Sequence, residues 1–247
     1  MNKKSLVKLK ALAAKGDVDA QCWLADYYLD YGNKKGYRSA IPWLKKASEL
    51  GDQWAQYELG LAYQEGLGVP KNIRQAMQYY NMSAEQGFDS AQLNLGIIYA
   101  NLKGRAINLD LAVRLYRRSA RKGNRNACFN LGFYYEIGRG VPQNNRLSYK
   151  WYLKAAELGD SEAQQIVGYY LHEGVGIRRD FDKSAFWYRK AAQAGDEYAQ
   201  YNLGLCYLDG DGVKQNSRTA INWFKKSAAQ GNKRAITKLK GMSLTRP

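Results

Sequence analysis

The sequence predicts an all-α fold of about six helix pairs with a half repeat at each end, and two periodic series predict it. An alanine series and a glycine series run through the 247 residues with gaps of 36 residues after a first gap of 35. A fixed period of this size is typical of stacked helical units. The two series are Ala20, Ala55, Ala91, Ala127, Ala163, Ala199 and Ala235, and Gly16, Gly51, Gly87, Gly123, Gly159, Gly195 and Gly231.

The first helix of each repeat is expected to begin just after a glycine of the series. Ala55 is followed by Leu59, Gly60 and Tyr63 at offsets that place them on one helix face. Later repeats carry similar residues at the same offsets. Glycine inside a helix costs about 1 kcal/mol relative to alanine, so its recurrence here predicts a close crossing with a second helix.

A turn with the pattern Gly-x-Gly-Val/Ile follows the first helix in four repeats, at 66–69, 138–141, 174–177 and 210–213. Glycine supplies positive φ there, and the β-branched residue can fill the core between helices. The expected N-caps of the second helix are Asn72, Asn144, Asp180 and Asn216. That helix ends at the next glycine of the series, and the Asp or Asn after the glycine caps the following helix.

These signals divide the chain into repeats 16–50, 51–86, 87–122, 123–158, 159–194 and 195–230. Residues 1–15 are expected to form an N-terminal capping helix, and residues 231–247 a C-terminal half repeat with a tail. Because each unit of a repeat protein contacts only its neighbours, we expect residues 1–247 to form a single elongated domain.

The repeated residues resemble those of the Sel1-like repeat family, relatives of the tetratricopeptide repeats. The resemblance covers residues 9–240 and is clearest at Ala199, Leu203, Gly204, Tyr207, Gly210, Gly212, Val213, Ala220, Trp223, Lys226, Ala228 and Gly231. It implies a right-handed α/α superhelix, or α-solenoid, with a concave face. It also implies a non-catalytic adaptor or scaffold, of a kind found in bacteria, that assembles protein complexes.

Two repeats depart from this pattern. In 87–122, Leu102 replaces the first turn glycine and Arg105 replaces the valine. In 16–50 the turn is one residue short, and Pro42 is expected early in the second helix. Unusual loops in repeat arrays often line one binding face, so the 101–109 turn is either sequence drift or a partner contact.

The composition favours a cytoplasmic protein. The chain has no run of 18 apolar residues, which a membrane-spanning helix requires. The N-terminus is basic like that of a secretory signal, but Lys8 and Lys10 interrupt its apolar stretch. Three cysteines, Cys22, Cys128 and Cys206, occupy different places in the repeat, which fits a reducing compartment. Secretion by a leaderless route stays open.

No pattern of residues indicates catalysis. His172 is the only histidine, and a metal site or a catalytic triad requires more partners. The Gly-x-Gly turns lack the lysine and the preceding strand of a phosphate-binding loop. No cysteine has an activating base nearby in the sequence. We therefore expect no enzymatic activity, no metal and no cofactor.

The formal net charge of +16 is concentrated at both ends and in residues 87–158. Basic pairs near the ends of the second helices are expected on the outer face. There they either complement the helix dipole as a solvated face or contact nucleic acid or an anionic membrane. The candidate residues for an anionic partner are Arg114, Arg117, Arg118, Arg121 and Lys122.

The resemblance implies that first helices line a concave groove, with inward positions one before and two, six, nine and ten after each alanine of the series. The candidate partner-binding residues are Trp54, Tyr57, Leu61, Phe129, Phe133, Glu136, Tyr169, His172, Tyr198, Tyr201 and Leu205. Aromatic residues dominate protein interfaces, although part of this set could instead pack between neighbouring first helices. Acidic residues in the set make the concave face less basic than the convex one. Asn94, Asn130 and Asn202 are expected to hydrogen-bond between repeats.

Together these observations predict a protein–protein interaction module that holds a protein or peptide of unknown identity in its groove. Two alternatives stay open. One is an immunity or regulatory protein that clamps a toxin or enzyme. The other is a protein that binds nucleic acid or an anionic membrane through its basic surface. Binding of such partners weakens as the salt concentration rises.

Overall fold

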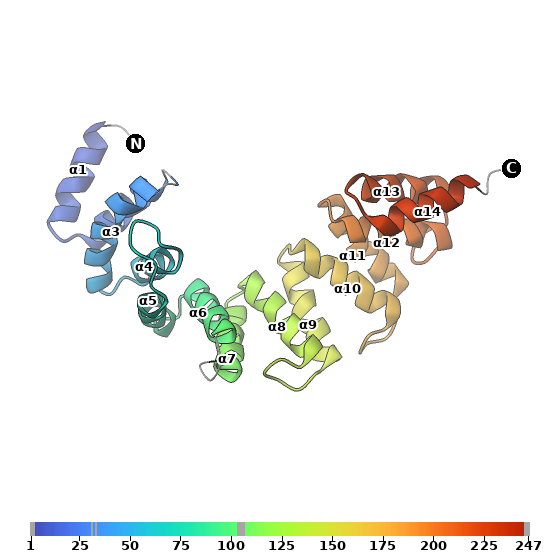
Figure 1. Ribbon diagram of the computed structural model, residues 1–247, viewed down its shortest axis with the longest axis horizontal. Coiled ribbons are helices and arrows are strands. Elements are labelled where there is room, and N and C mark those ends of the chain that lie inside the picture. The colour runs from blue at the N-terminus through green and yellow to red at the C-terminus, as the bar shows by residue number, and fades with distance from the viewer. Residues whose placement is uncertain (1–2, 31, 33, 103–106, 245–247) are drawn as a thin grey trace. The chain divides into compact units, whose positions relative to one another are not determined.

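The computed structural model describes residues 3–30, 32, 34–102 and 107–244, and these ranges contain fourteen helices and no strand (Figure 1). The helices are α1 (Lys3–Ala14), α2 (Val18–Leu29), α3 (Lys34–Glu49), α4 (Gln53–Glu65), α5 (Ile73–Glu85), α6 (Asp89–Asn101), α7 (Leu109–Arg121), α8 (Arg125–Ile137), α9 (Asn145–Glu157), α10 (Ser161–Glu173), α11 (Phe181–Gln193), α12 (Glu197–Asp209), α13 (Ser217–Ala229) and α14 (Lys233–Leu244).

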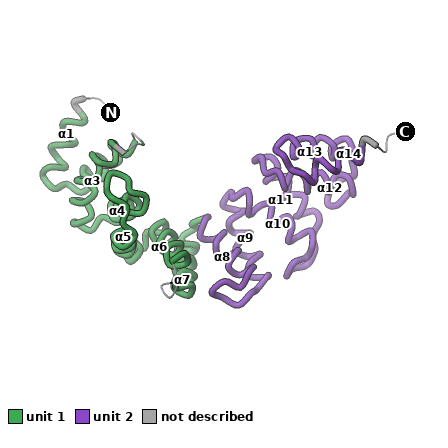
Figure 2. Tube along the Cα trace, in the orientation of Figure 1, with its two compact units in different colours: residues 1–124 green, residues 125–247 purple. Residues whose placement is uncertain are grey.

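Helices α2 to α13 form the six predicted pairs, and α1 and α14 are the two half repeats. The chain divides into two compact units, residues 1–124 (unit 1) and residues 125–247 (unit 2), which Figure 2 shows in different colours. Within each unit every helix contacts the next helix along the chain. The α-solenoid fold is therefore confirmed. That residues 1–247 form a single domain stays a prediction.

The predicted helix ends are present in the structure. Gly195, between α11 and α12, has φ +100°, a conformation that L side chains rarely adopt. The side chain of Asp196 then accepts a hydrogen bond from the amide of Ala199 at 2.7 Å and so caps α12. The predicted second-helix caps accept in the same way from the third following amide; they are Asn72, Asn144, Asp180 and Asn216.

In α4, α6, α8, α10 and α12 a glycine inside the helix allows an aromatic ring of the second helix to approach the helix backbone, whereas α2 has Ala25 at this position. A Cβ atom added to Gly60 would lie 2.5 Å from the Tyr80 ring, and one added to Gly132 would lie 2.7 Å from the Tyr152 ring. Both tyrosines are buried. The predicted close crossing at a glycine is therefore confirmed for these five pairs, and a Cβ atom at the glycine position would clash with the ring unless the neighbouring side chain shifted.

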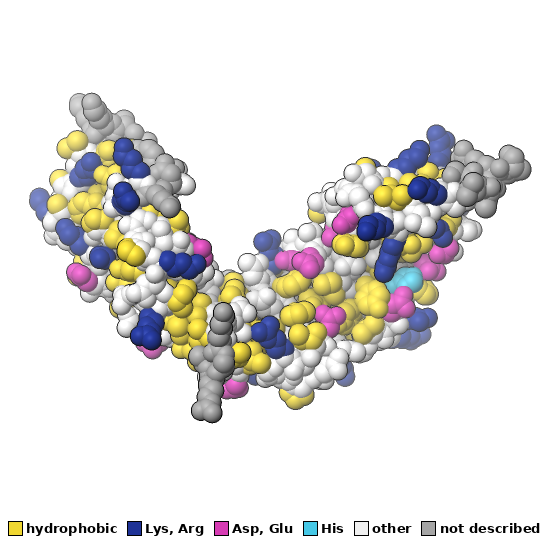
Figure 3. All heavy atoms as spheres, viewed as in Figure 1, with side chains coloured by type: hydrophobic (Ala, Val, Ile, Leu, Met, Phe, Trp, Pro, Cys, Tyr) yellow, Lys and Arg dark blue, Asp and Glu magenta, His cyan; other side chains and the backbone are white. Residues whose placement is uncertain are grey.

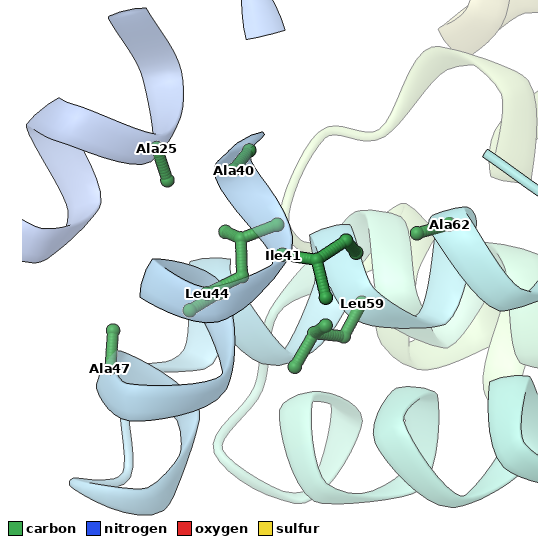
Figure 4. Packing of buried hydrophobic residues seen from close by; sticks show 8 residues of the cluster. Ala25, Ala40, Ile41, Leu44, Ala47, Leu59 and Ala62 are labelled. Atoms are coloured by element: carbon green, nitrogen blue, oxygen red, sulfur yellow. The ribbon is translucent and has the colours of Figure 1, made fainter. Parts of the chain in front are cut away.

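Buried alanines and leucines fill the remaining space between pairs. In unit 1, one cluster joins α2, α3 and α4 and includes Ala25, Leu44 and Leu59 (Figure 4). Polar side chains also join successive pairs: the buried Gln56 donates from Nε2 to the carbonyl of Ser48 at 3.3 Å. The glutamine after the series alanine makes the equivalent bond in four other repeats, through Gln21, Gln92, Gln164 and Gln200.

One element differs from its prediction. Helix α3 begins at Lys34, inside the segment interpreted as a turn, so Pro42 lies in the middle of the helix and not near its start. Pro42 is exposed, and its ring therefore faces solvent. Within the 101–109 turn, residues 103–106 fall outside the described residues, and the proposed contact there stays a prediction.

Candidate functional site

The candidate partner-binding residues lie on first helices, on a surface that we call the first-helix face. It consists of the positions one before and two, six, nine and ten after each alanine of the series. Helices α2, α4 and α6 carry it in unit 1, and α8, α10, α12 and α14 carry it in unit 2.

Three aromatic side chains of this face are well exposed, and all belong to unit 2. The exposed fraction is 39% for Phe133, 47% for Tyr169 and 56% for Tyr198. They come from α8, α10 and α12, over which Figure 3 shows hydrophobic atoms in yellow. Large rings held on capped helices offer apolar contact area at little cost in side-chain entropy.

Three other aromatic candidates pack inside their own unit. The ring centroid of Tyr57 lies 5.9 Å from that of Tyr80, that of Phe129 lies 5.3 Å from Tyr152, and that of Tyr201 lies 5.6 Å from Phe224. These rings thus cover the aromatic residues that fill the helix crossings, a packing role that the sequence pattern did not require. Trp54, Leu61 and Leu205 are partly buried, and Trp54 packs against the core cluster of unit 1.

Polar residues of the face make contacts between helices. Tyr152 donates from its hydroxyl to Glu136 Oε2 at 2.7 Å. Asn94 donates from Nδ2 to the Tyr80 hydroxyl at 3.1 Å, which joins two repeats of unit 1 as predicted for Asn94. Burial raises the pKa of the Tyr152 hydroxyl, and its hydrogen bond to Glu136 adds to the rise. These side chains are therefore mainly structural.

His172 joins two repeats of unit 2. Its Nδ1 lies 2.8 Å from Glu173 Oε1, and its Nε2 lies 3.2 Å from Asp211 Oδ2, in the turn of the following repeat. Figure 3 shows the imidazole in cyan beside acidic side chains in magenta. In the described part of the chain, no group of three or more His, Cys, Asp or Glu residues could hold a metal ion.

A hollow of about 410 Å³ opens beside this histidine on the first-helix face of unit 2. Helices α10, α11, α12 and α14 supply its wall, which contains the aromatic rings of Tyr169, Tyr188, Tyr198 and Tyr201. The guanidinium-bearing residue Arg234 of α14 completes the lining. The hollow thus combines exposed rings with a cation, on one rigid group of helices.

Sequence reasoning missed three residues of this face or beside it. Arg234 lies one residue before Ala235, so the positional rule would have found it had it been applied to the last alanine. Trp23 of α2 is 70% exposed, and its large apolar side chain was the only feature of the sequence that could have identified it as a candidate. Burial raises the pKa of the Glu58 carboxyl to about 7, and the charge of Asp26 adds to the rise. No sequence signal indicated that burial.

The basic candidates lie on α7 in unit 1. Arg114 forms an ion pair with Asp110 at 2.8 Å, and Arg118, Arg121 and Lys122 are exposed, whereas Arg117 is partly buried. Elsewhere on the second helices, several lysines lie over aromatic rings, as Lys226 does at 4.3 Å from the Trp223 ring centroid. Such cation–π contacts stabilise a solvated outer face. The lysines in these contacts, which carry part of the net positive charge, therefore have a structural role.

No disulfide joins the three cysteines, and burial lowers their reactivity. Cys22 is partly buried, and Cys128 and Cys206 are buried. Burial, with nearby acidic groups, raises the pKa of Cys22 and of Cys206 to about 12. A thiol of such high pKa is a poor nucleophile, because the thiolate is the reactive form.

The Sel1 repeat matches six consecutive segments, residues 18–52, 55–88, 89–124, 125–160, 161–196 and 197–232. The chain belongs to the Sel1 repeat family. Proteins built from Sel1 repeats are generally non-catalytic helical scaffolds that bind other proteins. No curated protein matches the chain. In the described part of this Sel1 repeat protein, no helix is long and apolar enough to cross a membrane.

Solved structures support the same assignment. The SLR-fold protective antigen c5321 of uropathogenic Escherichia coli is 36% identical, with a TM-score of 0.87 over 95% of this chain, but this chain spans only 50% of that one. A Sel1 repeat protein from Oxalobacter formigenes is 34% identical, with a TM-score of 0.79, and the match covers 88% of this chain and 90% of that one. The immunity protein PA5088 from Pseudomonas aeruginosa, 18% identical with a TM-score of 0.48 over 90% and 82% of the two chains, is too distant to bear on function.

Proposed function

We propose that this Sel1 repeat protein is a non-catalytic scaffold that binds a protein or peptide on its first-helix face. The observation that carries the proposal is the exposure of Phe133, Tyr169 and Tyr198. Aromatic rings of this kind are enriched among the residues that contribute most to protein–protein affinity. No disulfide joins Cys22, Cys128 and Cys206, which favours a reducing, cytoplasmic setting as part of the same proposal.

The test is an affinity capture from the native cell followed by mass spectrometry. A triple variant with Phe133→Ala, Tyr169→Ala and Tyr198→Ala is compared with the wild type and with Phe186→Ala. Phe186 is the matched control because it is 47% exposed but lies on the second helix α11. We expect the triple variant to lose the main partner, with at least a tenfold weaker interaction (about 1.4 kcal/mol), and the control to keep it.

If the protein instead binds its partner through the basic surface of α7, the capture experiment should give a different result. If capture survives the triple variant but is lost when Arg118 and Arg121 are reversed to glutamate, the site lies on α7 and the proposal is wrong. A salt titration separates the two cases further. Binding to phosphates weakens steeply as salt increases because counterions are released, whereas binding through exposed aromatic rings changes little.

A further inference from the structure

The hollow between α10, α12 and α14 of unit 2 continues into a second one on α14. The second hollow measures about 630 Å³ and shares Tyr201 and Arg234 with the first. Lys233, Thr237 and Lys238 also line it. One surface of unit 2 therefore runs from a ring-lined hollow to a basic strip on a single helix.

The cations of this strip have no acidic partner among the residues that the structure describes. Lys233 and Arg234 are exposed, and Lys238 is partly buried. Among the described residues, no carboxylate lies within ion-pairing distance of these three side chains; the ion pairs of unit 2 involve other cations, such as Arg125 and Lys183. Three positive charges without an acidic partner among the described residues, beside a ring-lined hollow, are complementary to carboxylates next to an apolar side chain.

The first hollow is equipped for an apolar side chain and for peptide groups. Tyr169, Tyr198 and Tyr201 offer their rings, while Gln165 and Asn202 bring amide groups that both donate and accept hydrogen bonds. Peptide backbone has the same two functions and would pair with such amides. The hollow is therefore suited to an extended chain with a large apolar residue.

We propose that unit 2 binds an extended peptide segment in which an apolar residue stands next to acidic residues. The apolar side chain enters the hollow lined by Tyr169 and Tyr198, and the neighbouring carboxylates face Lys233 and Arg234. This inference rests on the proposed scaffold function and names the chemistry of its partner.

The charges around the first hollow favour a peptide over a nucleic acid. Glu173 lines the hollow, and Asp211 lies against His172, which lines it too. A nucleic acid carries a phosphate at every nucleotide, so its backbone would meet these carboxylates at one end while it faced the cations at the other. A peptide avoids the conflict because its negative charges are confined to the residues beside α14.

The test measures fluorescence anisotropy of labelled probes with the full chain. The main probe is an eight-residue peptide with one leucine followed by three glutamates. In the comparison probes, serine replaces the leucine, or three lysines replace the glutamates, and an oligouridylate of equal length represents nucleic acid. We expect the leucine–glutamate peptide to bind, and every comparison probe to bind at least about tenfold more weakly.

Matched variants assign the binding to this surface. The double variant Lys233→Glu and Arg234→Glu, and separately Tyr198→Ala, should each weaken binding of the main probe by about tenfold or more. Lys225→Glu and Phe186→Ala, exposed positions on α13 and α11, should leave it unchanged. All five replaced side chains are exposed, so we expect every variant to fold, and circular dichroism verifies this.

Absence of binding, equal binding of the serine probe or tighter binding of the oligouridylate would overturn the inference. The capture experiment separates this failure from failure of the scaffold function. If the double variant on α14 keeps the native partner while the triple aromatic variant loses it, the scaffold stands and the acidic segment is wrong. If the triple variant itself keeps the partner, the scaffold function is wrong.

Discussion

The two units are built from the same helix pairs, but they present different first-helix faces. In unit 1 the face and its margin display the exposed Trp23 and Asp26 with the partly buried Glu58. In unit 2 it displays Tyr169 and Tyr198, with the cations of α14 at its end. Replacement of the exposed face residues should leave the helix crossings intact, because the crossings depend on the glycines and on the buried rings beside them. The comparison teaches that recognition can vary along the array at constant fold.

The largest effect should come from the crossing glycines, where the two units are alike. Gly60→Val in unit 1 and Gly132→Val in unit 2 each insert atoms against a buried tyrosine ring. We expect each variant to lower the free energy of unfolding by about 3 kcal/mol, measured by urea denaturation followed by circular dichroism. Gly241→Val on α14 is the control, because nothing lies within 4 Å of its added Cβ. A tolerated valine at either crossing would contradict the common architecture.

The next largest effect on stability is expected in unit 1, where the contribution of Glu58 depends on pH. The folded-state pKa of Glu58, about 7, exceeds the ordinary value of 4.5, so between these values the folded state binds more protons than the unfolded chain. The stabilising contribution of the protonated carboxyl is therefore present at low pH and is lost as the pH rises towards 7. We expect Glu58→Gln to raise the free energy of unfolding by about 1 to 2 kcal/mol near pH 8 and to change little near pH 4.

Chemical denaturation at both pH values measures this difference. The matched control is Glu65→Gln, because Glu65 lies on the same helix but is exposed. Its substitution should change the stability equally at both pH values. A Glu58→Gln variant with the same pH dependence as the wild type would show that this carboxyl is solvated in solution.

A smaller effect compares one hydrogen bond in each unit. Tyr152→Phe in unit 2 removes the donor to Glu136, whereas Tyr80→Phe in unit 1 removes the acceptor for Asn94. Because hydrogen bonds to charged groups contribute more, we expect losses of about 1.5 kcal/mol for Tyr152→Phe and about 0.5 to 1 kcal/mol for Tyr80→Phe. Thermal and urea denaturation of both variants give the comparison. A larger loss in unit 1 would reverse the expected order.

The smallest effect concerns the outer face, which should be equivalent in the two units. Lys46 lies 4.8 Å from the Trp43 ring centroid in unit 1, and Lys226 lies 4.3 Å from that of Trp223 in unit 2. Replacement of either lysine by methionine keeps the apolar stem and removes the charge. Each change should lower the free energy of unfolding by about 0.5 kcal/mol. Lys225→Met, one residue from Lys226, controls for the general reduction in net charge and should be neutral.

Local signals in the sequence were sufficient to predict the repeats and most helix ends. Asp196 caps α12 and Gly195 adopts positive φ because each depends on its own chemistry and on its immediate neighbours. The exposed aromatic residues were predicted as part of a larger set. The predicted start of α3 was wrong. The helix begins at Lys34, within a segment whose sequence is typical of a turn, because tertiary packing can override local propensity.

The separation of exposed from packed aromatic residues required the three-dimensional structure. Tyr57, Tyr169 and Tyr201 follow the same positional rule, yet only Tyr169 is well exposed, because residues on neighbouring helices cover the other two rings. The hollow lined by Tyr198 and Arg234 likewise joins residues of separate helices. Alanine, glycine and capping residues determine one turn or one helix crossing, so their roles can be predicted from the sequence. Burial and cavities arise between elements that are distant in the sequence, so they depend on tertiary packing.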